Sequence, residues 1–281
     1  MRALSATSVF FRLELAEARR SRWVLFTSLV YALVFGGFVW LGVRESSVLG
    51  FTGLSRVILS VANAVVLCVP LVALVATNQA IVRARQNGFF ELLLAQPVRR
   101  VSWLLGAVGA RLVVVAAPLL ALFLAALLYS ALGAKQDAAA SRTIARCLAV
   151  TLSLSWAFVG IGFWCSAVSK TPERATVVAL LVWLAASALH DFALIGTLLQ
   201  FRWSPQVVFA MAAANPVEAG RVAVLSSVDP DLATLGPVGF WLANTLGPKL
   251  TLGVGIGWPA FVGTAAFLAT ARRLNRLDLT G

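Results

Sequence analysis

Six long apolar runs dominate this sequence, and each is long enough to cross a lipid bilayer as a helix. A hydrocarbon core of about 30 Å requires roughly 20 helical residues at about 1.5 Å per residue. The chain is 60% hydrophobic and only 12% charged, whereas a soluble domain usually carries about a quarter charged residues. We therefore expect an all-α integral membrane protein, a single transmembrane domain over 1–281, with six transmembrane helices near 24–43, 57–82, 103–132, 144–168, 176–199 and 250–270.

The net charge of +12 does not indicate a nucleic-acid partner, because the basic residues flank the apolar runs. Charges in such positions set membrane orientation. Basic residues are more numerous on the side of the N-terminus, in pairs such as Arg99 with Arg100 and Arg272 with Arg273. We therefore expect a multi-pass protein of the bacterial inner membrane with both termini in the cytoplasm.

Residues 1–23 precede the first apolar run and have an amphipathic pattern. Apolar residues recur there at helical spacing, and charged residues lie among them: Val9, Phe10, Leu13 and Ala16, with Arg12, Glu14, Arg19 and Arg20. Such a segment is typical of a helix that lies in the membrane interface. The alternative is a frayed basic tail.

The segment 200–249, between the fifth and sixth runs, has a different character. It contains four prolines before Pro248 and no apolar run of spanning length. Short apolar pieces within it could lie on the membrane or re-enter it. We expect this periplasmic segment either to dock an external partner or to form a packed cap over the helix ends.

Catalytic and metal-binding motifs are sparse. The sequence has no G-x-x-x-x-G-K-[ST] phosphate loop, so it cannot cradle ATP in that manner. It has one histidine, two methionines and three cysteines, too few for a metal pathway, so we expect no metal or cofactor in this chain. Cys68, Cys147 and Cys165 form no close pair and are expected to be free thiols.

Ionisable residues inside the apolar runs are expensive to bury and should face protein or water. His190 and Asp191 lie within the fifth run. They indicate either a polar element of a translocation route or dimer seam, or an interhelical hydrogen bond that fixes packing. Arg111, in the third run, is expected to snorkel to the membrane surface.

The cytoplasmic segment 83–102 separates the second and third runs. Gly88 begins a short amphipathic stretch, and Pro97 follows it, before Arg99 and Arg100. The stretch is too short to span a membrane and too apolar to lie wholly in water. Two interpretations follow: a short helix that docks into a groove of a cytoplasmic partner, or an interfacial helix that rests on lipid.

This segment, Gly88-Phe-Phe-Glu-Leu-Leu-Leu-Ala-Gln-Pro-Val-Arg-Arg, resembles the glycine-to-proline element after the second span of type-2 ABC exporter permeases. There it is a coupling helix that seats on a separate ATP-hydrolysing subunit. The resemblance covers nearly the whole chain and implies that this chain is no enzyme by itself, since ATP and Mg are bound by a cytoplasmic ABC ATPase dimer. It assigns ATPase contact to Gly88, Phe89, Phe90, Glu91, Leu92, Leu93, Leu94, Pro97, Arg99 and Arg100, with a second contact at Lys170 and Glu173.

Within that family the chain is more similar to the membrane subunits of exporters that serve maturation of nitrous oxide reductase, a copper enzyme. The shared features occur in similar order: Glu14 with Arg22 and Trp23, the 49–52 turn, Pro70, Asp191, and Asn215-Pro216 with Arg221. This resemblance implies a homodimer and a periplasmic repeat protein as partner, with Asn215, Pro216, Glu218 and Arg221 as candidate contacts.

The chain also departs from the family pattern. Arg83 and Arg85 precede Gly88, where acidic residues are common, and Phe89-Phe90 replaces a Thr-Leu pair. A changed surface would suit a different ATPase. Two other functions therefore stay open, an export permease for a lipid, drug or other small molecule, and an intramembrane enzyme that uses His190 and Asp191.

Overall fold

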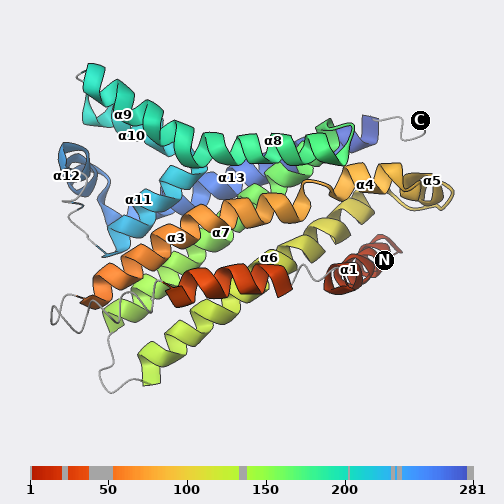
Figure 1. The fold of residues 1–281 in the computed structure, drawn as a ribbon, viewed down its shortest axis with the longest axis horizontal. Coiled ribbons are helices and arrows are strands. Elements are labelled where there is room, and N and C mark those ends of the chain that lie inside the picture. The colour runs from red at the N-terminus through yellow and green to blue at the C-terminus, as the bar shows by residue number, and fades with distance from the viewer. Residues whose placement is uncertain are drawn as a thin grey trace.

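A computed structural model of the chain describes residues 2–20, 25–37, 53–132, 138–201, 203–228, 232 and 236–276. The ordered elements in these ranges are helices, and no strand occurs among them. The long helices lie roughly side by side in one bundle (Figure 1). The predicted all-α class is confirmed for this part of the chain.

The centre of the bundle is α7, Ala138–Val168, which α3, α6, α11 and α13 all contact. Its closest partner is α13, Gly247–Arg276. Glycines allow this approach, because a Cβ added at Gly263 would lie 2.8 Å from the Ala157 Cα, and one added at Gly160 would lie 3.2 Å from the Gly263 Cα. The glycines of the sixth apolar run thus support helix packing, as small residues do in membranes.

The second apolar run is not one straight helix. It comprises α3, Gly53–Thr77, and α4, Ala80–Gln86, with an interruption at Asn78 and Gln79. The first amides of α4 have no intrahelical acceptors, and the Ser166 hydroxyl of α7 accepts from two of them, at 2.9 and 3.1 Å. The helix is therefore interrupted near the end of the predicted span 57–82, and α3 and α4 still form one candidate span, Ala64–Gln86, in the described residues.

The third run forms α6, Arg100–Leu132, and α1, Arg2–Arg20, packs along it. The fifth run forms α8, Pro172–Leu184, a π-helical turn at Ala185–Leu189, and α9, His190–Gln200. The α8–α9 span lies at the edge of the bundle (Figure 1), and only 6% of its most apolar window is buried. We expect that exposed face to contact lipid or another chain.

Two helices of the segment 200–249, α10 (Pro205–Ala214) and α11 (Pro216–Val228), meet at 117°. A third, α12, covers Gly236–Thr245. Helix α11 packs against α7 and α13 and contributes fully buried residues such as Val217 and Ala223 to the core. We call this pair the α10–α11 hairpin, and its bend fits either a broken span or a re-entrant loop.

Five helices in the described ranges are long and apolar enough to cross a membrane, or six when the hairpin is counted as one span. The first predicted span, 24–43, is described only at Leu25–Gly37, a shorter apolar helix. Its remaining residues, like the 49–52 turn, Arg22 and Trp23, lie outside the described residues. The predicted number of six spans stays a prediction.

Candidate coupling site

A short helix, α5 (Phe89–Leu94), projects at one end of the bundle beside α4 (Figure 1). Gly88 precedes it with φ of 68°, in the left-handed region where glycine has no steric penalty. This conformation turns the chain sharply between the C-terminal end of α4 and the start of α5. The sequence predicted a short helix between Gly88 and Pro97, and α5 lies there.

The α5 helix has one buried face and one exposed face. Phe90 and Leu93 are buried, at 1% and 3% exposure, whereas Leu92 is 68% exposed and Glu91 lies beside it on the surface. Burial of one face anchors the helix to the bundle. An exposed leucine next to a carboxylate on the other face is available to a partner.

An aromatic cluster anchors α5 to the first turn of α6. The Phe90 ring meets the Trp103 indole edge to face, with ring centroids 5.0 Å apart. Phe89 packs against the same indole at 5.8 Å. Trp103 itself is 1% exposed. Edge-to-face pairs of this kind add to the stabilisation from apolar burial, so α5 and α6 are joined by a rigid contact.

Trp103 also joins α6 to α1. Its indole N–H donates to Glu14 Oε1 at 3.1 Å, and the Glu14 carboxylate lies 3.6 Å from the Arg111 guanidinium. Burial raises the pKa of Glu14, partly offset by the Arg111 charge and the Trp103 hydrogen bond. In the structure α1 covers the Arg111 side chain and supplies its carboxylate, and the expectation that Arg111 snorkels to the membrane surface stays a prediction. Sequence reasoning did not find Trp103, since a tryptophan in an apolar run shows no sign of its partner.

Several polar contacts tie the helix ends together around α5. Arg100 Nη1 donates to the Leu274 carbonyl at 2.9 Å, which joins α6 to α13. Arg273 Nε donates to the Ala167 carbonyl at 3.0 Å, which joins α13 to α7. We call this part of the bundle the α5 end. Pro97 and Arg99, in the turn between α5 and α6, are exposed there.

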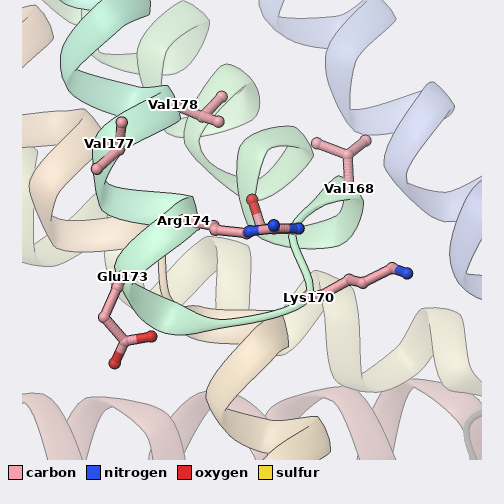
Figure 2. Close-up of a pocket in the computed structure, with 7 residues that line it drawn as sticks. Val168, Lys170, Glu173, Arg174, Val177 and Val178 are labelled. Carbon is pink, nitrogen blue, oxygen red and sulfur yellow. The ribbon is translucent and has the colours of Figure 1, made fainter.

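The turn from α7 to α8 also lies at the α5 end. The Thr171 hydroxyl accepts from the Arg174 amide and caps α8, and Gln79 Nε2 donates to Thr176 Oγ1 at 2.8 Å. Lys170 and Glu173 are both exposed, but Figure 2 shows them pointing in different directions. The two residues predicted to form one second ATPase contact, Lys170 and Glu173, therefore lie on different sides of the turn.

The remaining predicted site residues meet at the α10–α11 hairpin. Arg221 Nη1 lies 3.0 Å from Asp191 Oδ2 of α9 and 3.0 Å from Glu218 Oε1. We call these three residues the hairpin cluster. It connects the edge span α8–α9 to α11, and its side chains are 30% exposed or less.

Asn215 reinforces this connection beside Pro216. Its Nδ2 donates to the Ala186 carbonyl in the π-helical turn at 2.5 Å, and its Oδ1 accepts from the Val217 amide at 3.0 Å. His190 Nε2 is buried without a hydrogen-bond partner. The structure thus brings Asp191, Asn215, Glu218 and Arg221 together, in agreement with the packing alternative for the acidic residue. External contacts of these residues stay a prediction.

Within the described ranges, no group of three or more His, Cys, Asp or Glu side chains could hold a metal ion. Cys68, Cys147 and Cys165 are free thiols. At the α5 end the structure shows an exposed helix whose buried face is joined through Trp103 to two longer helices.

Comparison with known proteins agrees with this arrangement. Residues 9–258 match the family described as "ABC-2 family transporter protein". The chain belongs to the ABC-2 transporter family. Because the match covers most of the chain, including α5, the turn after α7 and the hairpin, these features belong to one family domain.

Two relatives narrow the family further. The chain is 29% identical over 273 residues to the "Probable ABC transporter permease protein NosY" of Stutzerimonas stutzeri, which covers 95% of this chain and 97% of the relative. It is 31% identical over 222 residues to the protein of the same name from Pseudomonas aeruginosa, covering 78% and 81%. The chain is thus a NosY-like permease subunit of an ABC transporter, a multi-pass membrane protein.

Proposed function

We propose that this chain couples ATP hydrolysis by a separate cytoplasmic ATPase to conformational change in the membrane, and that α5 is the element on which the ATPase seats. The observation behind this proposal is that α5 has one buried face and one exposed face. Phe90 and Leu93 hold the helix in the bundle, while Glu91 and Leu92 remain free for a groove on the ATPase. Helix-in-groove docking uses an exposed apolar anchor in this way.

Force on α5 would reach the bundle by two routes. One passes through the Phe90–Trp103 contact to α6 and through Glu14 to α1. The other passes through α4, whose first amides bond Ser166 of α7. Packed helices transmit such displacements as rigid bodies, so ATP-driven closure would tilt α6 and α7. Glu173, exposed beside α4, is the candidate for a second ATPase contact.

The chain would work as a symmetric pair in the bacterial inner membrane, with both termini and the α5 end in the cytoplasm. A dimer of ATPases needs two docking sites, and one chain offers one α5. The exposed face of the α8–α9 span is available for pairing or for lipid. Polar groups in the hairpin cluster would then fix the opposite end of the same span.

The further role that we propose is maturation of nitrous oxide reductase, through a periplasmic repeat protein that docks on the segment 200–249. The similarity to NosY over nearly the full length of the chain supports this role. The position of the α10–α11 hairpin is compatible with this role. Because α11 packs against α7 and α13, a movement of these two helices would displace the hairpin and the external partner bound to it.

The docking proposal is tested by co-purification of the tagged chain with its ATPase from native membranes. Leu92→Asp places a charge on the exposed face of α5 and should abolish retention of the ATPase. Leu250→Asp is the matched control, since Leu250 is 59% exposed at the other end of the bundle. Equal retention of the ATPase by Leu92→Asp and the unaltered chain would contradict the assignment of α5.

The maturation proposal has its own test. Deletion of the gene should leave nitrous oxide reductase short of copper, and the unaltered chain should restore it while Leu92→Asp should not. A fully loaded reductase in the deletion strain would contradict this role. A general export permease for a small molecule would then be the better description of the same architecture.

A further inference from the structure

The turn between α7 and α8 carries a cleft whose basic side chains, unlike Glu173, are not used in the proposed coupling route. It is an open cleft of about 520 Å³ lined by Val168, Ser169, Lys170, Glu173, Arg174, Val177 and Val178. Figure 2 shows the side chains of Lys170 and Arg174 extending in the same direction, whereas Glu173 points away from them. Two cations therefore share one side of the turn.

These cations have no acidic partner in the described part of the chain. The ion pairs found there involve only Arg111 and Arg221, and Lys170 and Arg174 are both exposed. A third cation lies nearby, because the Arg273 guanidinium bonds the Ala167 carbonyl one residue before Val168. The cleft is thus a concentrated positive site that invites an anion.

The apolar part of the cleft indicates which anion. Val168 and Val177 are 37% and 56% exposed and lie on the membrane-spanning helices that flank the turn. One candidate span ends at Val168 and the next begins at Pro172. Lys170 therefore lies in the turn between two spans and Arg174 in the first turn of the second span, each close in sequence to one of the exposed valines, and a turn between spans lies at a membrane surface. A cationic site next to an apolar wall matches the chemistry of an anionic phospholipid.

We propose that this cleft binds the phosphate headgroup of an anionic phospholipid through Lys170 and Arg174, with an acyl chain against Val168 and Val177. Basic pockets between transmembrane helices at the membrane surface bind anionic headgroups in this manner. The site goes beyond ATPase docking and does not require it. It assigns Lys170 to lipid, and leaves Glu173 to the cytoplasmic side of the same turn.

Native mass spectrometry of the purified full chain in mild detergent tests the site directly. The probes are phosphatidylglycerol, which is anionic, and phosphatidylcholine, which is zwitterionic. The unaltered chain should retain phosphatidylglycerol in preference to phosphatidylcholine. Lys170→Gln combined with Arg174→Gln should weaken the phosphatidylglycerol affinity by about tenfold or more, given the contribution expected of two basic residues at a membrane surface.

Two controls separate this site from general surface charge. Lys170→Arg combined with Arg174→Lys keeps both charges and should retain the lipid, and Lys249→Gln, at the other end of the bundle, should leave its affinity unchanged. Equal retention of both lipids would overturn the proposal, as would an unaltered phosphatidylglycerol affinity in the double glutamine variant. Loss of the ATPase from that variant with lipid retention intact would also overturn it, by showing that the two cations bind protein.

Discussion

The Trp103 indole N–H donates to the Glu14 carboxylate at 3.1 Å, across the interface between α6 and α1. The same indole packs edge to face with the Phe90 ring of α5. One side chain therefore connects α6 to the neighbouring helix α5 and to α1, which is far from both in sequence. Because Trp103 lies in the first turn of α6, any movement of α5 must displace both α6 and α1 or break this contact.

Trp103→Phe should preserve the packing against Phe90 and lose the hydrogen bond to Glu14. Loss of a hydrogen bond to a charged group costs about 1.5–3 kcal/mol. Trp103→Ala should also open a cavity and cost about 3–5 kcal/mol. We expect ATPase activity of the assembled complex to persist but lose its coupling to transport in Trp103→Ala, with Trp103→Phe intermediate. Thermal unfolding and ATPase assays measure both effects. Normal coupling in Trp103→Ala would show that the cluster does not transmit force.

Glu14 should give the stability of the chain a dependence on pH. Burial raises the pKa of Glu14 in the folded chain above its ordinary value. Between the pKa of the unfolded chain and that of the folded chain, Glu14 is therefore protonated in the folded chain and ionised in the unfolded chain. The contribution of Glu14 to stability is therefore highest below the unfolded pKa and falls as pH rises through the folded pKa. Glu14→Gln removes this dependence, so its melting temperature should rise relative to the unaltered chain as pH increases. The opposite trend would mean that pairing with Arg111 outweighs burial.

Arg221 Nη1 lies 3.0 Å from a carboxylate oxygen of each acid in the hairpin cluster, Asp191 and Glu218. Arg221→Gln leaves those acids facing each other, whereas Asp191→Asn leaves Arg221 paired with Glu218. We expect Arg221→Gln to cost about 2 kcal/mol, between the values for exposed and buried pairs, and Asp191→Asn to cost less. Melting temperatures of the two purified variants give the order. Addition of Asp191→Asn to Arg221→Gln should recover part of the loss, and an additive loss would contradict the arrangement.

Two glycines of α13 should respond oppositely to alanine. A Cβ at Gly263 would lie 2.6 Å from Trp156 Cδ1 and 2.8 Å from the Ala157 Cα, whereas a Cβ at Gly257 would have nothing within 4 Å. Gly263→Ala should therefore cost about 1–3 kcal/mol through overpacking against α7. Gly257→Ala should be neutral or stabilise the helix by up to about 1 kcal/mol. Similar melting temperatures for the two variants would contradict the close α7–α13 crossing.

Much of the fold follows from local properties of the sequence. Apolar length predicted the helices that became α6, α7, α8–α9 and α13, and Gly88 with Pro97 bracketed α5. These features depend on residues close together in the chain. The helix α13 was harder to predict from local sequence, because its glycines lower helix propensity. Those glycines are explained by the close packing of α13 against α7.

The parts that sequence reasoning missed depend on contacts between distant residues. The break at Asn78 and Gln79 requires the Ser166 hydroxyl, 85 residues after Ile81. Arg111 required Glu14 as a partner. The hairpin residues were expected to face an external protein, and only the tertiary arrangement brings Arg221 to Asp191. No local pattern encodes such pairs.

The most direct test of the account is cross-linking between α5 and the ATPase in native membranes. Leu92→Cys places a thiol on the exposed face of α5, and Leu250→Cys at the other end of the bundle is the control; Cys68, Cys147 and Cys165 give the background. The account predicts a short-spacer cross-link from position 92 to the ATPase, absent from position 250, with a yield that changes when ATP is added. If the thiol at position 92 reacts with a soluble reagent but forms no cross-link to the ATPase, the central claim that α5 is the coupling element is contradicted.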